Sequence, residues 1–136
     1  MKRVLAVLVL GVALTACGGD GASSPTAATG LNATSWTLAS MNERAPVGDS
    51  VPTLAFDDAG NVSGSAGCNT YSTPTEIEGN SIAFGPLATT QMACAGAAGV
   101  QERAFLQAMD EVRAYAMDTQ GRLVLEDGVV LVFEPD

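Results

Sequence analysis

The sequence contains no histidine, and this absence removes several classes of catalytic site. Without it, neither a Ser-His-Asp nor a Cys-His arrangement is available for nucleophilic catalysis. Gly64 and Gly67 do not form a phosphate-binding loop, because their spacing is too short and no helix is predicted directly after them. We therefore expect no catalytic residue, no cofactor and no resident metal, and we expect that the protein is not an enzyme.

Basic residues are scarce as well. The 136 residues include 6 Lys and Arg but 15 Asp and Glu, which gives a formal net charge of −9. Binding to nucleic acid and adsorption to anionic lipid head groups both require a basic surface, so we expect neither. The excess of acid predicts a soluble, self-repelling surface and a monomeric protein.

Long hydrophobic runs are absent except at the N-terminus. Met1-Lys2-Arg3 precedes the apolar run Val4–Leu14, which at about eleven residues is too short to span a bilayer and is typical of a signal peptide. The run ends in Leu14-Thr15-Ala16-Cys17, which resembles a bacterial lipobox. Residues 1–16 are thus predicted to be a lipoprotein signal peptide. The alternatives are an ordinary secretory signal and a transmembrane anchor.

Cleavage after Ala16 would make Cys17 the lipidated first residue, anchored to a membrane without spanning it. It would also remove Lys2 and Arg3, so that the net charge of −9 becomes −11. Residues 17–30 are rich in glycine, serine, alanine and threonine, which predicts a flexible tether before a folded domain at 31–136. We expect a location in the cell envelope, either on the periplasmic face of the outer membrane or on the outer surface of the plasma membrane.

Short runs of alternating apolar and polar residues, separated by turn residues, predict a mainly β (α+β) domain. Many short strands and a single helix are typical of a small barrel or sandwich. The last strand is nearly all apolar, which predicts a central strand buried on both faces. Asp49, Asp57 and Asp58 lack the alternation of a calcium loop, so a turn is the better interpretation. The predicted strands cover residues 36–41, 53–56, 61–65, a short edge strand ending at Ile77, 81–84, 114–117, 122–125 and 129–133, with Trp36, Leu38, Leu54, Phe56, Ile82 and Phe84 facing inward.

One helix is predicted over residues 100–112, after a small and glycine-rich connection at 93–99. Glu102 lies off the apolar stripe of this helix. Such a helix either covers the β-core or docks a partner. The predicted stripe consists of Val100, Ala104, Phe105, Ala108, Met109 and Val112.

Cys68 and Cys94 are the only cysteines beyond the leader. Outside the cytoplasm, two thiols in a small domain usually pair, and a disulfide closing this loop of about 27 residues is worth roughly 3 kcal/mol. A redox-active pair and a metal site are the alternatives. The first lacks a CxxC-like spacing, and the second lacks histidine and a third thiol.

Several short motifs together resemble the META domain of HslJ-type proteins, and the resemblance covers roughly residues 31–134. The resemblance implies a small lipocalin-like antiparallel β-barrel or half-barrel of about eight short strands with one helix. It also implies a link to heat or envelope stress and no established catalysis. The residues that carry it are Gly67-Cys68-Asn69-x-Tyr71, Thr90-x-Met92-Ala93-Cys94, Glu102-x-x-Phe105 and Trp36-x-Leu38.

Three functions remain open on this basis. The first is a non-catalytic envelope lipoprotein, anchored to the membrane through Cys17, that binds an envelope protein or acts in envelope stress. The second is a carrier of a small apolar ligand in a lipocalin-like barrel. The third is a thiol-redox protein that uses Cys68 and Cys94. We expect the first.

Overall fold

The computed structural model describes residues 30–136. The predicted signal peptide (1–16), the predicted lipidation site Cys17 and all of the predicted tether except Gly30 lie outside these residues. Within the part described, no helix has the length and apolar character needed to cross a bilayer.

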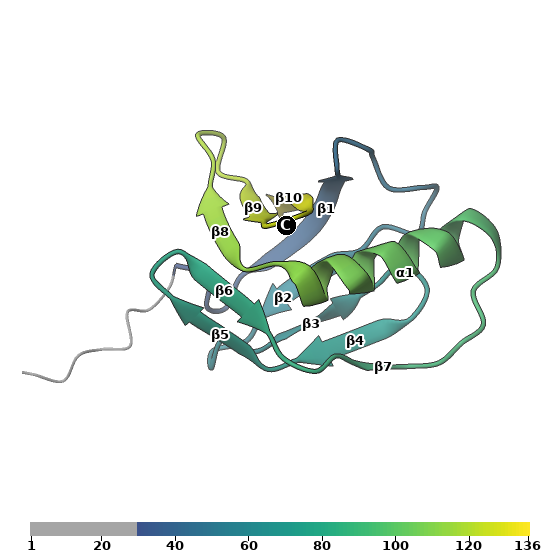
Figure 1. Ribbon diagram of the computed structural model, residues 1–136, viewed down its shortest axis with the longest axis horizontal. Coiled ribbons are helices and arrows are strands. Elements are labelled where there is room, and N and C mark those ends of the chain that lie inside the picture. The colour runs from purple at the N-terminus through teal and green to yellow at the C-terminus, as the bar shows by residue number, and fades with distance from the viewer. Residues whose placement is uncertain (1–29) are drawn as a thin grey trace, which may run out of the picture.

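Ten antiparallel strands form one sheet that curls into a half-barrel (Figure 1). Their order is β5-β6-β8-β9-β10-β1-β2-β3-β4-β7, so the first and last strands of the domain pair at the centre. The mainly β fold predicted from the sequence is confirmed. The strands are β1 (Ser35–Met41), β2 (Thr53–Phe56), β3 (Val62–Ser65), β4 (Thr70–Thr73), β5 (Thr75–Glu78), β6 (Ser81–Phe84), β7 (Ala88–Thr89), β8 (Ala114–Met117), β9 (Leu123–Glu126) and β10 (Val130–Pro135).

The sheet has ten strands, whereas about eight were expected, and the extra strands arise at a bend around Pro74. Only Pro74 separates β4 from β5, and β4 pairs with β7 while β5 pairs with β6. The segments 70–78 and 81–89 are therefore two arms of one long hairpin, bent where proline lacks an amide to donate. Because β4 also pairs with β3, and β6 with β8, this bent hairpin connects the two ends of the curled sheet.

The helix α1 (Gly96–Glu111) lies across the inner side of the sheet (Figure 1). The Phe105 ring packs edge-on against Tyr71 and Phe133, with ring centroids 5.6 Å and 6.4 Å away. The helix thus covers the core, as one of the two interpretations predicted. It begins four residues earlier than the predicted position 100, since Gly96 to Gly99 are already helical.

The core lies between α1 and the concave face of the sheet. The residues predicted to face inward from β1, β2 and β6 are all buried. The last strand corrects one expectation, because β10 is buried on one face only: Leu131 and Phe133 are inside, whereas Val130 is 41% exposed. A half-barrel has one packed face, so a run of apolar residues need not indicate burial on both.

Two glycines allow backbones to approach closely. A Cβ at Gly64 would lie 2.2 Å from the Thr53 carbonyl oxygen, and a Cβ at Gly99 would lie 2.1 Å from the Cys94 carbonyl oxygen. Both contacts are with backbone, which cannot move aside without displacing a strand or the start of the helix.

We predict that Gly64→Ala and Gly99→Ala each lower the free energy of unfolding by at least about 2 kcal/mol, because the added methyl group overlaps backbone atoms. Urea denaturation measures this. Gly30→Ala is the control, since nothing lies within 4 Å of a Cβ there. Wild-type stability in either of the first two variants would contradict the packing described.

Candidate functional site

The structure brings the predicted disulfide and the residues of the predicted family motif together beside the start of α1. The turn between β3 and β4 carries Gly67, Cys68 and Asn69, and the segment before α1 carries Met92 and Cys94. A disulfide joins the two segments, with the Cα atoms of its cysteines 6.2 Å apart. Segments that are distant in sequence therefore form one cluster, which we call the Asn69 cluster (Gly67, Cys68, Asn69, Thr90, Met92, Cys94 and Glu102).

Asn69 lies at the centre of this cluster and is only 5% exposed. Its side-chain oxygen accepts hydrogen bonds from the Thr90 hydroxyl at 2.9 Å and from the Met92 amide at 2.7 Å. Its side-chain nitrogen donates to the Met92 carbonyl at 3.1 Å and to Glu102 Oε1 at 2.7 Å. A primary amide has two donors and two acceptor positions, so the capacity of this side chain is fully used.

Glu102 provides the acceptors that the turn before β4 requires. Its Oε2 accepts from the amides of Cys68 at 3.0 Å and Asn69 at 2.6 Å. This side chain is only 7% exposed, so Glu102 lies on the buried side of the helix although the sequence placed it off the apolar stripe. Val100, which is 59% exposed, and Ala104 are instead among the exposed positions of the helix, although the apolar stripe had placed both inside.

Two opposing effects act on the pKa of the Glu102 carboxyl. Burial raises this pKa, whereas hydrogen bonds from the Asn69 amide, the Asn69 side chain and the Cys68 amide, together with the charge of Arg103, lower it. The hydrogen bonds prevail, so the pKa lies below its ordinary value and the group is a carboxylate at neutral pH.

Gly67 and Tyr71, two further residues of the family motif, also have structural roles. Gly67 has φ +114°, a backbone conformation that favours glycine. Tyr71 is buried and its hydroxyl donates to the Thr53 carbonyl at 2.8 Å. Burial raises the pKa of this phenol, which keeps it protonated.

Gln101 is a buried polar residue that sequence reasoning did not single out. Its side-chain oxygen accepts from the Val47 amide at 2.7 Å and its nitrogen donates to the Ser50 carbonyl at 2.6 Å. It therefore attaches the loop between β1 and β2 to the helix. The sequence held the same signal for both polar residues, since Gln101 and Glu102 lie four and three positions before the core residue Phe105, and such spacings place residues on one helical face.

The chemistry open to the Asn69 cluster is limited by these bonds. The two sulfur atoms and the Glu102 carboxylate lie within 4.8 Å of one another, close enough for a metal site. However, both sulfur atoms are bonded to each other, so neither is the thiolate that a metal or a nucleophilic mechanism needs. Glu102 already accepts three hydrogen bonds, from the Cys68 amide, the Asn69 amide and the Asn69 side chain, which leaves it poorly suited to act as a general base.

The model of the META domain family matches residues 29–136. The chain belongs to the META domain family. The resemblance of the motifs to this family is thus confirmed over the whole described domain. No curated protein matches the chain closely enough to count as a relative.

Two solved structures share the fold of this META domain. One is a protein from Burkholderia xenovorans solved by NMR, with 26% identity and a TM-score of 0.67, over 82% of this chain and 88% of that one. The other is a protein solved by NMR, with 20% identity and a TM-score of 0.62, over 76% of this chain and 89% of that one. The second likeness concerns the fold alone.

We predict that Glu102→Gln destabilises the META domain by about 3 kcal/mol at pH 7, because the new amide nitrogen is a donor that faces other donors. The lowered pKa of Glu102 stabilises the fold above the unfolded-state value, about 4.3, and this contribution is lost as the pH falls through the lower folded-state value. The difference from wild type should therefore shrink below about pH 4.

Urea denaturation of both proteins between pH 3 and pH 7 measures this difference. Glu111→Gln is the matched control on the same helix, since Glu111 is exposed and should change stability by less than about 0.5 kcal/mol. Equal effects of the two substitutions, or a difference that does not depend on pH, would contradict the role given to Glu102.

Proposed function

We propose that this META-domain protein is a non-catalytic lipoprotein of the cell envelope that acts by binding another envelope protein under heat or envelope stress. The sequence Leu14–Cys17 supports the anchor, because a cysteine directly after a small-residue cleavage site is the pattern for lipidation. The small and polar residues 18–29 would let the domain stand away from the membrane surface.

One observation supports the proposed binding role most strongly. The polar groups of Asn69, Glu102 and Tyr71 all serve hydrogen bonds inside the domain. The motif residues thus build the fold and leave little chemistry for a substrate. What the domain then offers to other molecules is its outer surface, and a surface of stable shape is suited to recognising a protein.

The carrier function is less well supported. The inner side of the half-barrel is filled by the side chains of Phe105, Met109 and Phe133, each fully buried. The larger grooves found in residues 30–136 lie on the surface, such as one of about 710 Å³ beside Trp36 and Met117. An apolar ligand would need an enclosed and largely apolar cavity.

The thiol-redox function is also disfavoured. Cys94 Sγ lies 3.6 Å from Glu102 Oε1, so reduction would release a thiolate next to a carboxylate. Repulsion between two like charges at that distance disfavours the thiolate and makes it a poorer leaving group. The position of Glu102 therefore favours a lasting disulfide.

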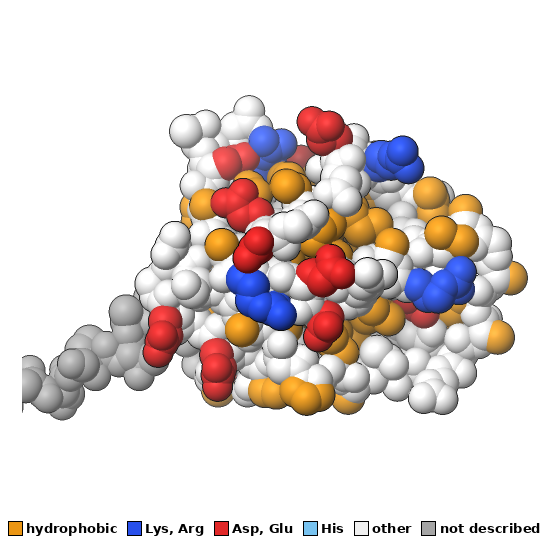
Figure 2. Space-filling view, viewed as in Figure 1, with side chains coloured by type: hydrophobic (Ala, Val, Ile, Leu, Met, Phe, Trp, Pro, Cys, Tyr) orange, Lys and Arg blue, Asp and Glu red, His pale blue; other side chains and the backbone are white. Residues whose placement is uncertain are grey.

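The surface agrees with a soluble, monomeric domain beside the membrane. Figure 2 shows acidic side chains distributed over the face that carries α1, with a few basic ones between them. Like charges on two copies repel each other, which opposes self-association. The same charges disfavour contact with anionic lipid, so the lipid at Cys17 would be the means of attachment.

We predict that Cys17→Ser moves the protein from the membrane fraction to the soluble fraction and abolishes incorporation of labelled palmitate in cells. The hydroxyl of serine cannot form the thioether that carries the lipid. Cys68→Ser is the matched control, because it should leave palmitate incorporation intact. Unchanged membrane attachment of the Cys17→Ser protein would overturn the anchoring proposal.

The binding role is tested by crosslinking in living cells before and after heat shock, followed by mass spectrometry. We expect one dominant envelope protein, captured in larger amounts after heat shock. A co-purified lipid or small molecule in the absence of any specific protein would contradict the binding role and favour the carrier.

A further inference from the structure

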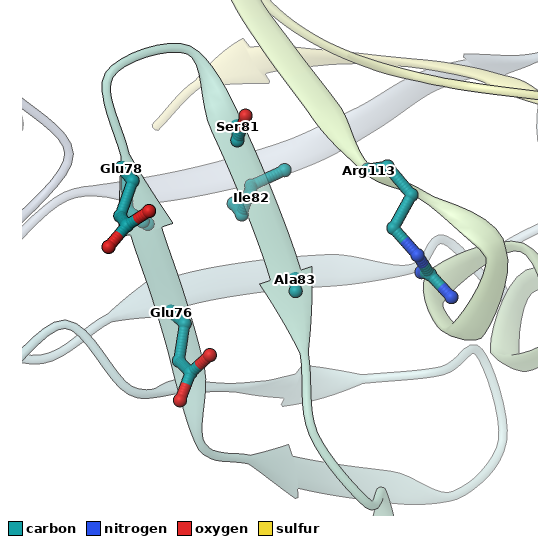
Figure 3. A pocket seen from close by; sticks show the side chains of 7 residues that line it. Glu76, Glu78, Ser81, Ile82, Ala83 and Arg113 are labelled. Atoms are coloured by element: carbon teal, nitrogen blue, oxygen red, sulfur yellow. The ribbon is translucent and has the colours of Figure 1, made fainter.

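The strand β5 ends the sheet and has a free edge. It pairs with β6 on one side and has no partner strand on the other within residues 30–136. Figure 3 shows β5 and β6 as neighbouring arms of the hairpin, with the side chains of Glu76 and Glu78 on β5. Both edges of the sheet are open in this way, but β7 has only two residues, whereas β5 has four.

The register of the hairpin determines which backbone groups of β5 are unpaired. The Gly85 amide donates to the Pro74 carbonyl at 2.8 Å, and Glu76 faces Ala83 across the ladder. Hydrogen-bonded and non-hydrogen-bonded pairs alternate along an antiparallel ladder. The amides and carbonyls of Thr75 and Ile77 therefore point away from β6, and no other hydrogen bond within residues 30–136 reaches them.

The side chains of β5 divide between two faces. Ile77 is half-buried and packs against the core, whereas Glu76 and Glu78 are exposed on the outer face. They form one wall of a groove of about 590 Å³ that also includes Arg113 on the far side of β6 (Figure 3). The Arg113 guanidinium donates to the carbonyls of Asp110 and Val112, which holds it near the helix end. The free edge itself thus carries two negative charges.

The negative charges of Glu76 and Glu78 determine which kind of strand can pair with the free edge of β5. In a pairing between two copies of β5, Glu76 and Glu78 would meet glutamates of the other copy on the same face, and like charges across a sheet are destabilising. A partner strand with basic side chains on that face would instead form favourable cross-strand pairs. On the opposite face, next to Ile77, an apolar side chain fits best.

From this arrangement we propose that the β5 edge docks an extended segment of a partner protein in which basic and apolar residues alternate. The segment would add one strand to the sheet through the unpaired groups of Thr75 and Ile77, and its basic residues would lie beside Glu76 and Glu78. This inference rests on the proposed role as a protein-binding module and names its surface and the chemistry of its partner.

The test uses the full chain as isolated from cells, labelled with 15N, and a capped six-residue peptide of alternating lysine and valine. We expect the peptide to shift the NMR signals of residues 75–78 and to slow hydrogen exchange at the Thr75 and Ile77 amides. A peptide with glutamate in place of lysine should not bind. Raising the salt from 50 to 300 mM should weaken binding several-fold, because the contacts are exposed ion pairs.

Two double variants separate the edge from the general acidity of the protein. Glu76→Lys with Glu78→Lys should weaken peptide binding at least tenfold, since attraction becomes repulsion. Glu126→Lys with Glu134→Lys makes the same change in net charge on β9 and β10, which are paired on both sides, and should leave binding within twofold. Equal loss in both double variants, or signal shifts away from β5, would overturn the inference.

The two proposals can fail separately. If crosslinking in cells captures an envelope partner that the Glu76→Lys, Glu78→Lys protein still binds, and the peptide does not bind at β5, then this inference is wrong and the proposed function stands. If the peptide binds at β5 but no protein is captured in cells, then the proposed function fails and the edge remains a peptide-binding surface.

Discussion

The fold depends on one buried carboxylate. Glu102 projects from α1 and accepts the amides of Cys68 and Asn69, which lie in the turn between β3 and β4. Buried amides in a turn need acceptors, and a charged acceptor strengthens such bonds. Asn69 extends the connection to the segment before α1, and the disulfide between Cys68 and Cys94 closes it covalently. Sheet, connecting segment and helix are thereby held at one point.

This arrangement explains why a strongly patterned stretch of sequence need not be a binding site. Asn69 and Tyr71 are the residue types that bind ligands in many proteins, yet here both are directed into the domain. Their hydrogen bonds allow the helix to close over the half-barrel, which a chain of this size needs in order to bury enough apolar surface. Under the proposed function, recognition would fall to exposed elements such as the acidic edge of β5.

Much of the fold follows from the sequence because it is local. The alternation in residues 53–56 and 81–84 correctly predicts two strands. What the sequence could not supply depends on distant partners. The burial of Glu102 requires amides from a turn 33 and 34 residues away. Likewise, the exposure of Val100 and Val130 reflects which faces the half-barrel leaves uncovered, and periodicity alone does not contain this information.

Native-state hydrogen exchange at the Asn69 amide tests the central claim most directly. If Glu102 and the disulfide hold the cluster as described, this amide should open only with the whole domain, and its exchange should report the global free energy of unfolding. Its protection should then match that of core amides such as Leu131 in β10. Exchange of the Asn69 amide many-fold faster than that of Leu131, by local opening, would contradict the account and show that the cluster is a mobile surface turn.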